Sequence, residues 1–463
     1  MILTLAWRSL FAHPVRSAVL AAGFGLGVAV MAILLGVGRV VLEQARAPEL
    51  SGGGDVLVTA HAGTVTAARV LLAGALDVAP LQRWTRAASP WSRDTLYLVD
   101  GRGSLPVRAR GGIPSLEQAL SDPEIEGQPW RDTAADARWS SPSAEDLLRS
   151  VDRFHPLPDV PRHAGSWAEW LYFNGRAADV RFYLTFMVGP RERRDSTSRR
   201  LASVRLQLDR GGAVESFAAV TGLSDDEVAR APELTIAGNS VRLAGGQYRL
   251  SLDLRSARGR RVAGTLTLDA TPERLMPPIE VFGAGGWRTG YVVPVMAGAL
   301  AGTLDVDGTA VRFDAGSGYH DHNWGFWKGV SWQWGQVHHG DTSIVFGRVF
   351  PPADVADAER MPGFLGAIGP DGPIGFATNV TIEETNDASG RPARIVIQGR
   401  NAALDLRLTF SVNDIVVNPM QGGPLATGLD FLQMRGTYDV RGRVSGRDLS
   451  FAAPGAAETF RGQ

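Results

Sequence analysis

Hydrophobic and polar positions alternate with a period of two in many short segments of the last two-thirds of the chain. The alternation is clear in residues 180–188, 204–208, 248–254 and 404–410, where the even positions are apolar. A period of two predicts strands that bury one face. Turn sequences such as Gly211-Gly212 and Asp307-Gly308 separate these segments, and no long helical pattern lies between them. The sequence therefore predicts a mainly β body built as antiparallel barrels or sandwiches.

The N-terminal part has a different pattern. Residues 17–38 form an apolar run without a charged side chain, and about 20 such residues in a helix cross the hydrocarbon core of a membrane. A cleaved signal peptide is the alternative, but its apolar core is typically shorter, at about 7–15 residues. We therefore predict an interfacial and transmembrane helix in residues 1–42. Arg8 and Arg16 precede the run and two arginines follow it, so the charges leave the orientation open.

Residues 43–150 have a mixed pattern. Short strands are expected at residues 55–60 and 95–99, and short helices at 114–121 and 143–150. Proline and serine are frequent in residues 140–162, which favours a linker there. The β body is expected to begin at about residue 151.

Composition narrows the function classes. The chain has 463 residues, with 47 basic and 48 acidic side chains and a formal charge of -1. No excess of positive charge is present to attract nucleic acid, so we predict no nucleic-acid partner. The sequence has no cysteine, which excludes disulfides, thiolate metal sites and cysteine nucleophiles.

The densest group of candidate functional residues lies between residues 287 and 339, which contain five of the 12 Trp and four of the eight His. On a strand, His320 and His322 would point to one side while Tyr319, Asp321 and Asn323 point to the other. The following tryptophans could line a barrel mouth with indole rings. The alternative is that the rings fill the core and that the polar residues form a satisfied buried network.

A metal site must also be considered, because a His-x-His pair on a strand can present two imidazoles to one ion. The cupin arrangement needs a glutamate shortly after the second histidine, and none follows His322 in this segment. His338 could supply a third ligand. We nevertheless predict that the protein requires no metal and no cofactor.

A second feature is Glu169, which has Trp167 and Trp170 near it in the sequence. Removal of water by such rings would raise the pKa of this carboxyl. The alternative is a surface glutamate beside two half-buried rings.

Three motifs in residues 150–463 resemble the AttH/carotenoid 1,2-hydratase family, which includes kievitone hydratase-like proteins. They are EWLYFNG at 169–175, the segment from Tyr291 to Gly308 around VPVM, and GYHDHNWG at 318–325 followed by WQWG at 332–335. The resemblance implies two packed lipocalin-like barrels, at residues 151–328 and 329–463, that add water to a C=C bond of an apolar molecule without a cofactor. It also places the family's Tyr-x-Asp-x-Asn-Trp motif on Tyr319 and Asp321.

The first part of the chain resembles the start of a lipoprotein-exporter or macrolide-exporter type of ABC permease, including an extracytoplasmic segment at residues 43–150. This resemblance implies a single-pass protein of the inner membrane with its body on the periplasmic side. An ABC transporter ATPase or permease would then be a partner. No second apolar run of similar length follows, so a complete permease is excluded.

Together these observations predict a membrane-tethered, cofactor-free hydratase, with Asp321 as the proton donor. Tyr319, His320 or His322 would hold the attacking water, and Glu169 would be the next acid to test. The residues expected to bind the hydrophobic substrate are Trp170, Tyr172, Tyr291, Asn323, Trp324, Trp332, Trp334 and His338. The alternative is a non-catalytic lipocalin-like module that holds a lipid for an ABC exporter.

Overall fold

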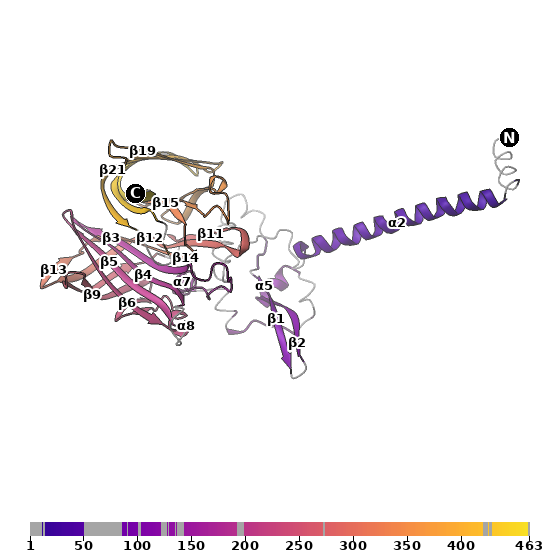
Figure 1. The fold of residues 1–463 in the computed structure, drawn as a ribbon, viewed down its shortest axis with the longest axis horizontal. Coiled ribbons are helices and arrows are strands. Elements are labelled where there is room, and N and C mark those ends of the chain that lie inside the picture. The colour runs from indigo at the N-terminus through magenta and orange to yellow at the C-terminus, as the bar shows by residue number, and fades with distance from the viewer. Residues whose placement is uncertain are drawn as a thin grey trace. The chain divides into compact units, whose positions relative to one another are not determined.

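The computed structural model describes residues 12, 14–50, 86–89, 91–100, 103–121, 127, 129–134, 136, 143–191, 199–271, 274–419, 425 and 428–461 (Figure 1). The chain divides into two compact units. One consists of Met1–Thr59 and Arg83–Ala137, and the other of Ala60–Gln82 and Arg138–Gln463.

The first unit contains helix α2 (Pro14–Leu50), helix α5 (Pro114–Ala119) and a hairpin of β1 (Trp91–Asp100) and β2 (Gly103–Gly112). Three predictions are confirmed here: a helix over residues 17–38, a strand over 95–99 and a short helix at 114–121. The strand expected at 55–60 lies outside the described residues.

Within the part of the chain that the structure describes, no helix is both long and apolar enough to cross a membrane. The helix predicted over residues 17–38 is therefore present, but its assignment as a transmembrane segment is not supported. The periplasmic location and the ABC transporter partner stay predictions from the sequence.

The second unit begins with an antiparallel barrel. Its elements are β3 (Trp167–Ala177), β4 (Val180–Arg191), β5 (Arg200–Arg210), β6 (Ala213–Leu223), α8 (Asp225–Val228), β7 (Thr235–Ile236), β8 (Asn239–Ala244), β9 (Gln247–Ser256), β10 (Arg261–Asp269), β11 (Met276–Phe282), η2 (Ala284–Gly286), β12 (Arg288–Val306), β13 (Thr309–Arg312) and β14 (Gly316–Phe326). Eight strands pair in the order β10-β12-β14-β3-β4-β5-β6-β9, and pairing of β9 with β10 closes the ring. The remaining short strands, β7, β8, β11 and β13, extend it.

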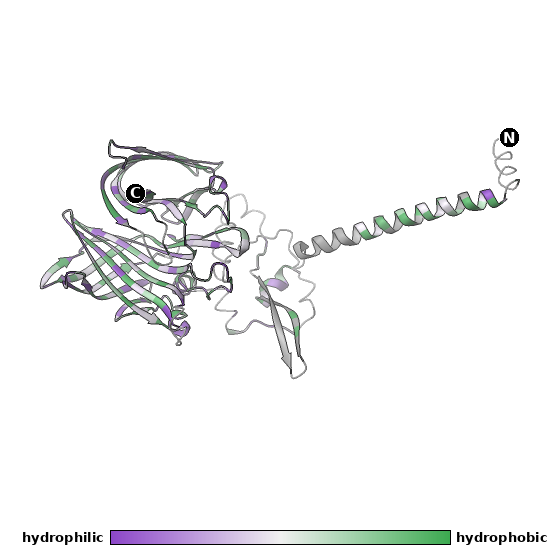
Figure 2. Ribbon diagram, in the orientation of Figure 1, coloured by the Kyte–Doolittle hydropathy of each residue, from purple (hydrophilic) through white to green (hydrophobic). Residues whose placement is uncertain are grey.

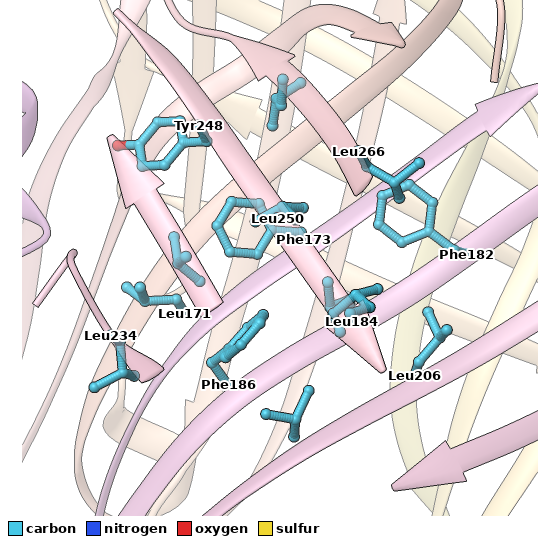
Figure 3. Close-up of a cluster of buried hydrophobic side chains, with 14 of the residues drawn as sticks. Leu171, Phe173, Phe182, Leu184, Phe186, Leu206, Leu234, Tyr248, Leu250 and Leu266 are labelled. Atoms are coloured by element: carbon cyan, nitrogen blue, oxygen red, sulfur yellow. The ribbon is translucent and has the colours of Figure 1, made fainter. Parts of the chain in front are cut away.

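Apolar side chains from alternate positions fill the barrel interior. Phe182, Leu184 and Phe186 of β4 face inward together with Leu171 and Phe173 of β3 (Figure 3). All five are essentially buried, and the alternation of polar and apolar residues along the strands is visible in Figure 2. This confirms the period-two prediction. It also leaves the interior packed with side chains, so the ligand space must lie elsewhere.

Helix α7 (Ala144–Val151) packs against this barrel core. Ser143 begins it with a capping box, in which its hydroxyl accepts from the Asp146 N–H and the Asp146 carboxylate accepts from the Ser143 N–H. Leu148 is fully buried, and the Asp152 carboxylate after the helix accepts a 2.6 Å bond from the Tyr248 hydroxyl. The prediction of a linker over residues 140–162 is therefore wrong for its described part, because α7 brings a hydrophobic face that the barrel buries.

The rest of the unit is a second antiparallel sheet. It comprises β15 (Ser331–His339), β16 (Thr342–Phe350), η3 (Ala358–Arg360), β17 (Phe364–Gly369), β18 (Gly372–Ala377), β19 (Val380–Asn386), β20 (Pro392–Arg400), β21 (Leu404–Pro419), β22 (Asp430–Val444) and β23 (Arg447–Arg461). The strand order is β18-β17-β16-β15-β23-β22-β21-β20-β19. Its end strands, β18 and β19, do not pair with each other in the described residues, so it is a curled half-barrel (Figure 1). The expectation of two closed barrels is corrected here, because the end strands of this sheet stay unpaired in the described residues.

Aromatic side chains join the two sheets. The rings of Tyr172 and Tyr319, from the barrel, pack edge-on against Trp334 of β15 at centroid distances of 6.4 and 5.5 Å. A buried ion pair adds to this contact, since Arg435 of β22 binds Asp209 of β5. The contact between the sheets positions the site described next.

Candidate functional site

A cavity of about 1210 Å³ lies between the outer wall of the barrel and the second sheet. The barrel contributes Trp170, Tyr172, Tyr291, Asp321 and Asn323, and the second sheet contributes Trp332, Trp334 and Glu458. Seven of the residues predicted from the sequence thus line one cavity, which lies outside the barrel and not in its mouth.

Strand register explains why these side chains meet. Asp321 on β14 is opposite Tyr172 on β3, and Tyr172 is opposite Thr185 on β4. Directly opposed residues of an antiparallel pair share a face. The next pairing along the same face joins Asn323 to both Trp170 and Tyr291. The barrel therefore presents an ordered row of polar and aromatic groups to the second sheet.

Asp321 is the central acid of this row. It is 4% exposed, and its carboxylate accepts a 2.7 Å bond from the Asn323 amide. Burial raises the pKa of Asp321 well above its ordinary value, the negative charge of Glu458 raises it further, and hydrogen bonds from Tyr319 and Asn323 only partly oppose this. Its surroundings therefore favour the protonated form of this carboxyl.

Tyr319 does not line the cavity itself, but it is hydrogen-bonded to Tyr291, which does. Its hydroxyl lies 2.6 Å from the Tyr291 hydroxyl, and the Tyr291 oxygen accepts a 2.9 Å bond from the Trp334 indole. Burial raises the pKa of both tyrosines well above the ordinary value. Both phenols therefore stay neutral.

Glu458 of β23 is a site residue that the sequence did not reveal. It is half-buried, is opposite Trp334 in the sheet and accepts a 3.0 Å bond from the Trp332 indole. Burial raises its pKa to about 7, against the opposing effect of bonds from Trp332 and Gln433. The surrounding sequence, AAETF, offers no motif, and only the pairing of β15 with β23 brings Glu458 to the cavity.

His320 and His322 lie on the opposite face of β14 and do not reach the cavity. Both are fully buried. The Nε2 of His320 lies 2.8 Å from Asp152, and its ring stacks on Phe173 at 4.0 Å. The prediction that either histidine holds the attacking water in the substrate cavity is wrong, because alternate residues of a strand point to opposite faces.

Glu169 also lies on this opposite face. Burial by itself would raise its pKa, as the sequence suggested, but His155 and His322 bind the carboxylate and lower the pKa to about 2. Its role as a reserve acid is therefore not supported by its surroundings. Its carboxylate form is favoured, and both histidines contact it.

Two further predicted residues lie away from the cavity. His338 forms a 2.9 Å bond with the Ser343 hydroxyl, and Trp324 stacks on His155 at 4.6 Å on the other face of β14. The Trp324 indole donates a 2.9 Å bond to Glu280, which does line the cavity. Trp327 does line the cavity, and its indole N–H donates a hydrogen bond to the Ala168 carbonyl.

The chain matches no protein-family model and no curated protein. Among solved structures it is similar to CghA with Sch210972, at a TM-score of 0.43 and 12% identity over 64% of this chain and 89% of that one. It is also similar to NE1406 from Nitrosomonas europaea, a candidate AttH, at a TM-score of 0.40 and 13% identity over 63% of this chain and 91% of that one. Since both identities are low, the function has to be inferred from the residues that line the cavity.

Proposed function

We propose that the protein is a cofactor-free lyase that adds water to a C=C bond of an apolar substrate, with Asp321 as the proton donor. The observation that carries this proposal is the buried carboxyl of Asp321, with a raised pKa, in the wall of a largely apolar cavity. Protonation of an unactivated alkene carbon needs an acid, and an apolar surround keeps a carboxyl protonated at neutral pH.

The reaction follows from the groups present. The π electrons of the alkene take the proton of Asp321 and form a C–H bond, which leaves a carbocation at the second carbon. Water adds to that carbon, and its surplus proton returns to the Asp321 carboxylate. The product is an alcohol, and the acid is regenerated.

Aromatic rings support the cationic intermediate. Trp332 and Trp334 of the second sheet and Tyr172 of the barrel line the same cavity as Asp321. Their π faces stabilise positive charge, and their bulk limits the entry of water. The buried Tyr172 hydroxyl, which also interacts with Asn174, belongs to a residue of the cavity wall and would hold the single attacking water.

The size of the cavity supports a long apolar substrate. At about 1210 Å³ it exceeds the usual range of about 300–1,000 Å³ for pockets that bind small molecules. The same property favours the second candidate function, a non-catalytic carrier of a lipid or hydrophobic metabolite. Only the buried acid Asp321 distinguishes the two functions, because a carrier does not need one.

The test is incubation of the full-length protein with a panel of isoprenoid alkenes in heavy water, followed by mass spectrometry. The expected product has gained one water and carries one deuterium on carbon. In Asp321→Asn the shape is kept but the proton is lost, so the rate should fall by about 10²–10⁴. Binding of the alkenes by this variant, measured as displacement of a fluorescent apolar dye, should be the same as in the wild type.

Asp439→Asn is the matched control, because Asp439 forms an exposed ion pair with Arg441 outside the cavity. It should react as the wild type does. If Asp321→Asn retains turnover within tenfold of wild type, Asp321 is not the proton donor. If the alkenes displace the dye from both the wild type and Asp321→Asn but neither protein forms product, the carrier function replaces the lyase function.

A further inference from the structure

We propose that His155, Glu169 and His322 form a binding site for one divalent transition-metal ion, of the zinc class, at the end of the barrel away from the substrate cavity. The potential ligand atoms of these three residues lie within 4.8 Å of one another. Two imidazoles and one carboxylate are a common ligand set for such ions. This proposal does not depend on the function of the cavity.

The His-x-His motif has no carboxylate close to it in the sequence, but a neighbouring strand of the sheet supplies one. Glu169 lies on β3, the strand that pairs with β14, and faces the same side as His322. Its Oε1 is 2.9 Å from the His322 Nε2 and 2.7 Å from the His155 Nδ1. The third ligand comes from the segment after α7, which no local motif would predict.

The orientation of His322 suits a metal ligand. Its Nδ1 lies 2.9 Å from the Val151 carbonyl oxygen, so Nδ1 carries a proton and donates it. In the neutral ring this leaves the lone pair on Nε2, which points at the cluster. A backbone carbonyl that fixes the tautomer in this way is typical of metal-binding histidines.

Crowding at one oxygen favours a metal ion over protons alone. The Glu169 Oε1 has three close neighbours: the His155 N–H at 2.9 Å, the His155 Nδ1 and the His322 Nε2. A carboxylate oxygen has two lone pairs, so three donors on it cannot all be well directed. A cation between Oε1 and the two ring nitrogens removes this crowding.

The surroundings provide access and rigid walls. A second cavity of about 620 Å³ is lined by His155 and Trp324, and the His155 side chain is 16% exposed. Ions and a water ligand can therefore reach the open coordination position. Phe154 stacks on His322 at 5.2 Å, and Trp324 stacks on His155 at 4.6 Å, which limits the motion of both imidazoles.

In this role the bound ion holds the end of the barrel together. The three ligands come from β3, β14 and the segment that joins α7 to β3, so one ion ties together parts far apart in the sequence. Asp321 lies one residue before His322 and points to the opposite face. The ion is thus expected to fix β14 without touching the substrate.

The experiment uses the full-length protein without a histidine tag. Metal content is measured by mass spectrometry after dialysis, zinc affinity by competition with a chromogenic chelator, and stability by thermal unfolding. Wild type should bind one zinc per chain and unfold at a higher temperature when zinc is added. His155→Gln should weaken zinc binding by more than about 100-fold, because even the outer partners of metal ligands change affinity by about 10–100-fold.

His163→Gln is the matched control, because His163 lies in the same loop and packs on Phe326 at 5.3 Å without approaching Glu169. It should bind zinc as the wild type does. Since His155 is partly exposed, His155→Gln should fold even without metal, and its circular dichroism spectrum will show this. Equal zinc affinity of His155→Gln and wild type, or no zinc bound by wild type at micromolar free zinc, overturns the proposal.

Discussion

The hydroxyl oxygens of Tyr291 and Tyr319 lie 2.6 Å apart, so one of the two hydroxyls donates a hydrogen bond to the other. The Trp334 indole can only donate, so the Tyr291 oxygen accepts from it. Tyr319 is also hydrogen-bonded to the Asp321 carboxyl. This chain of hydrogen bonds links the second sheet to the acid of the barrel.

Replacement of Tyr291 by Phe should break this chain at its first step. The Trp334 N–H, in a largely buried position, would lose its acceptor, which typically costs about 1–3 kcal/mol. We therefore expect a loss of unfolding free energy of this size in chemical denaturation. Asp439→Asn, which changes only an exposed ion pair with Arg441, is the control. A Tyr291→Phe variant as stable as the control would show that the bond between the sheets contributes little.

The rate of the proposed hydration should depend on pH in a defined direction. Asp321 must be protonated to act as an acid, and its pKa is raised by burial. The rate should therefore be constant at low pH and fall as pH rises through that raised pKa. A solvent deuterium isotope effect should accompany the plateau, because the proton is transferred to carbon. A rate that rises with pH would instead indicate that a carboxylate acts as a base.

Glu458 should make stability depend on pH. Its pKa in the folded protein is about 7 against an ordinary value of 4.5, so its charged form is disfavoured by folding. The resulting cost is absent below pH 4.5, grows between 4.5 and 7 and is constant above 7. Glu458→Gln should then stabilise the protein at pH 8 by up to about 3 kcal/mol, with no change at pH 4. Denaturant unfolding at the two pH values measures this, and equal effects at both would contradict it.

Much of the barrel could be predicted from the sequence, because alternation reports directly which residues share a face. This rule alone predicts that His322 and Asp321 lie on opposite sides of β14. The rule does not say which face is inside the barrel, and large apolar residues such as Phe173 and Phe186 occupy the interior. For that reason the ligand space lies outside the barrel, where the second sheet covers it.

The residues that sequence analysis missed depend on contacts between distant segments. Glu458 reaches the cavity because β23 pairs with β15. Asp152 and His155 meet the buried histidines because α7 packs on the barrel. The low pKa of Glu169 has the same origin, since its two histidine partners come from other parts of the chain. No local pattern of residue types contains this information.

The ion pair between the sheets gives the last prediction. Asp209 of β5 is 2% exposed, and it binds Arg435 of β22, which also binds Asp414. Asp209→Asn keeps the shape and the bond that its Oδ1 accepts from the Gly212 N–H, but it leaves the guanidinium with one partner. Loss of one member of a buried pair typically costs about 3–5 kcal/mol. We expect a loss near the lower end of this range, because Asp414 remains.

A second substitution separates the charge effect from simple disruption of the interface. Arg435→Met in the Asp209→Asn background removes the uncompensated guanidinium, whose own pKa burial already lowers. The double variant should therefore be more stable than Asp209→Asn alone, because replacing a buried ion pair by apolar groups is often neutral. Urea unfolding of the four proteins of this cycle measures the coupling. If the double variant loses the sum of the two single effects, Asp209 and Arg435 contribute independently and their ion pair does not couple the two sheets.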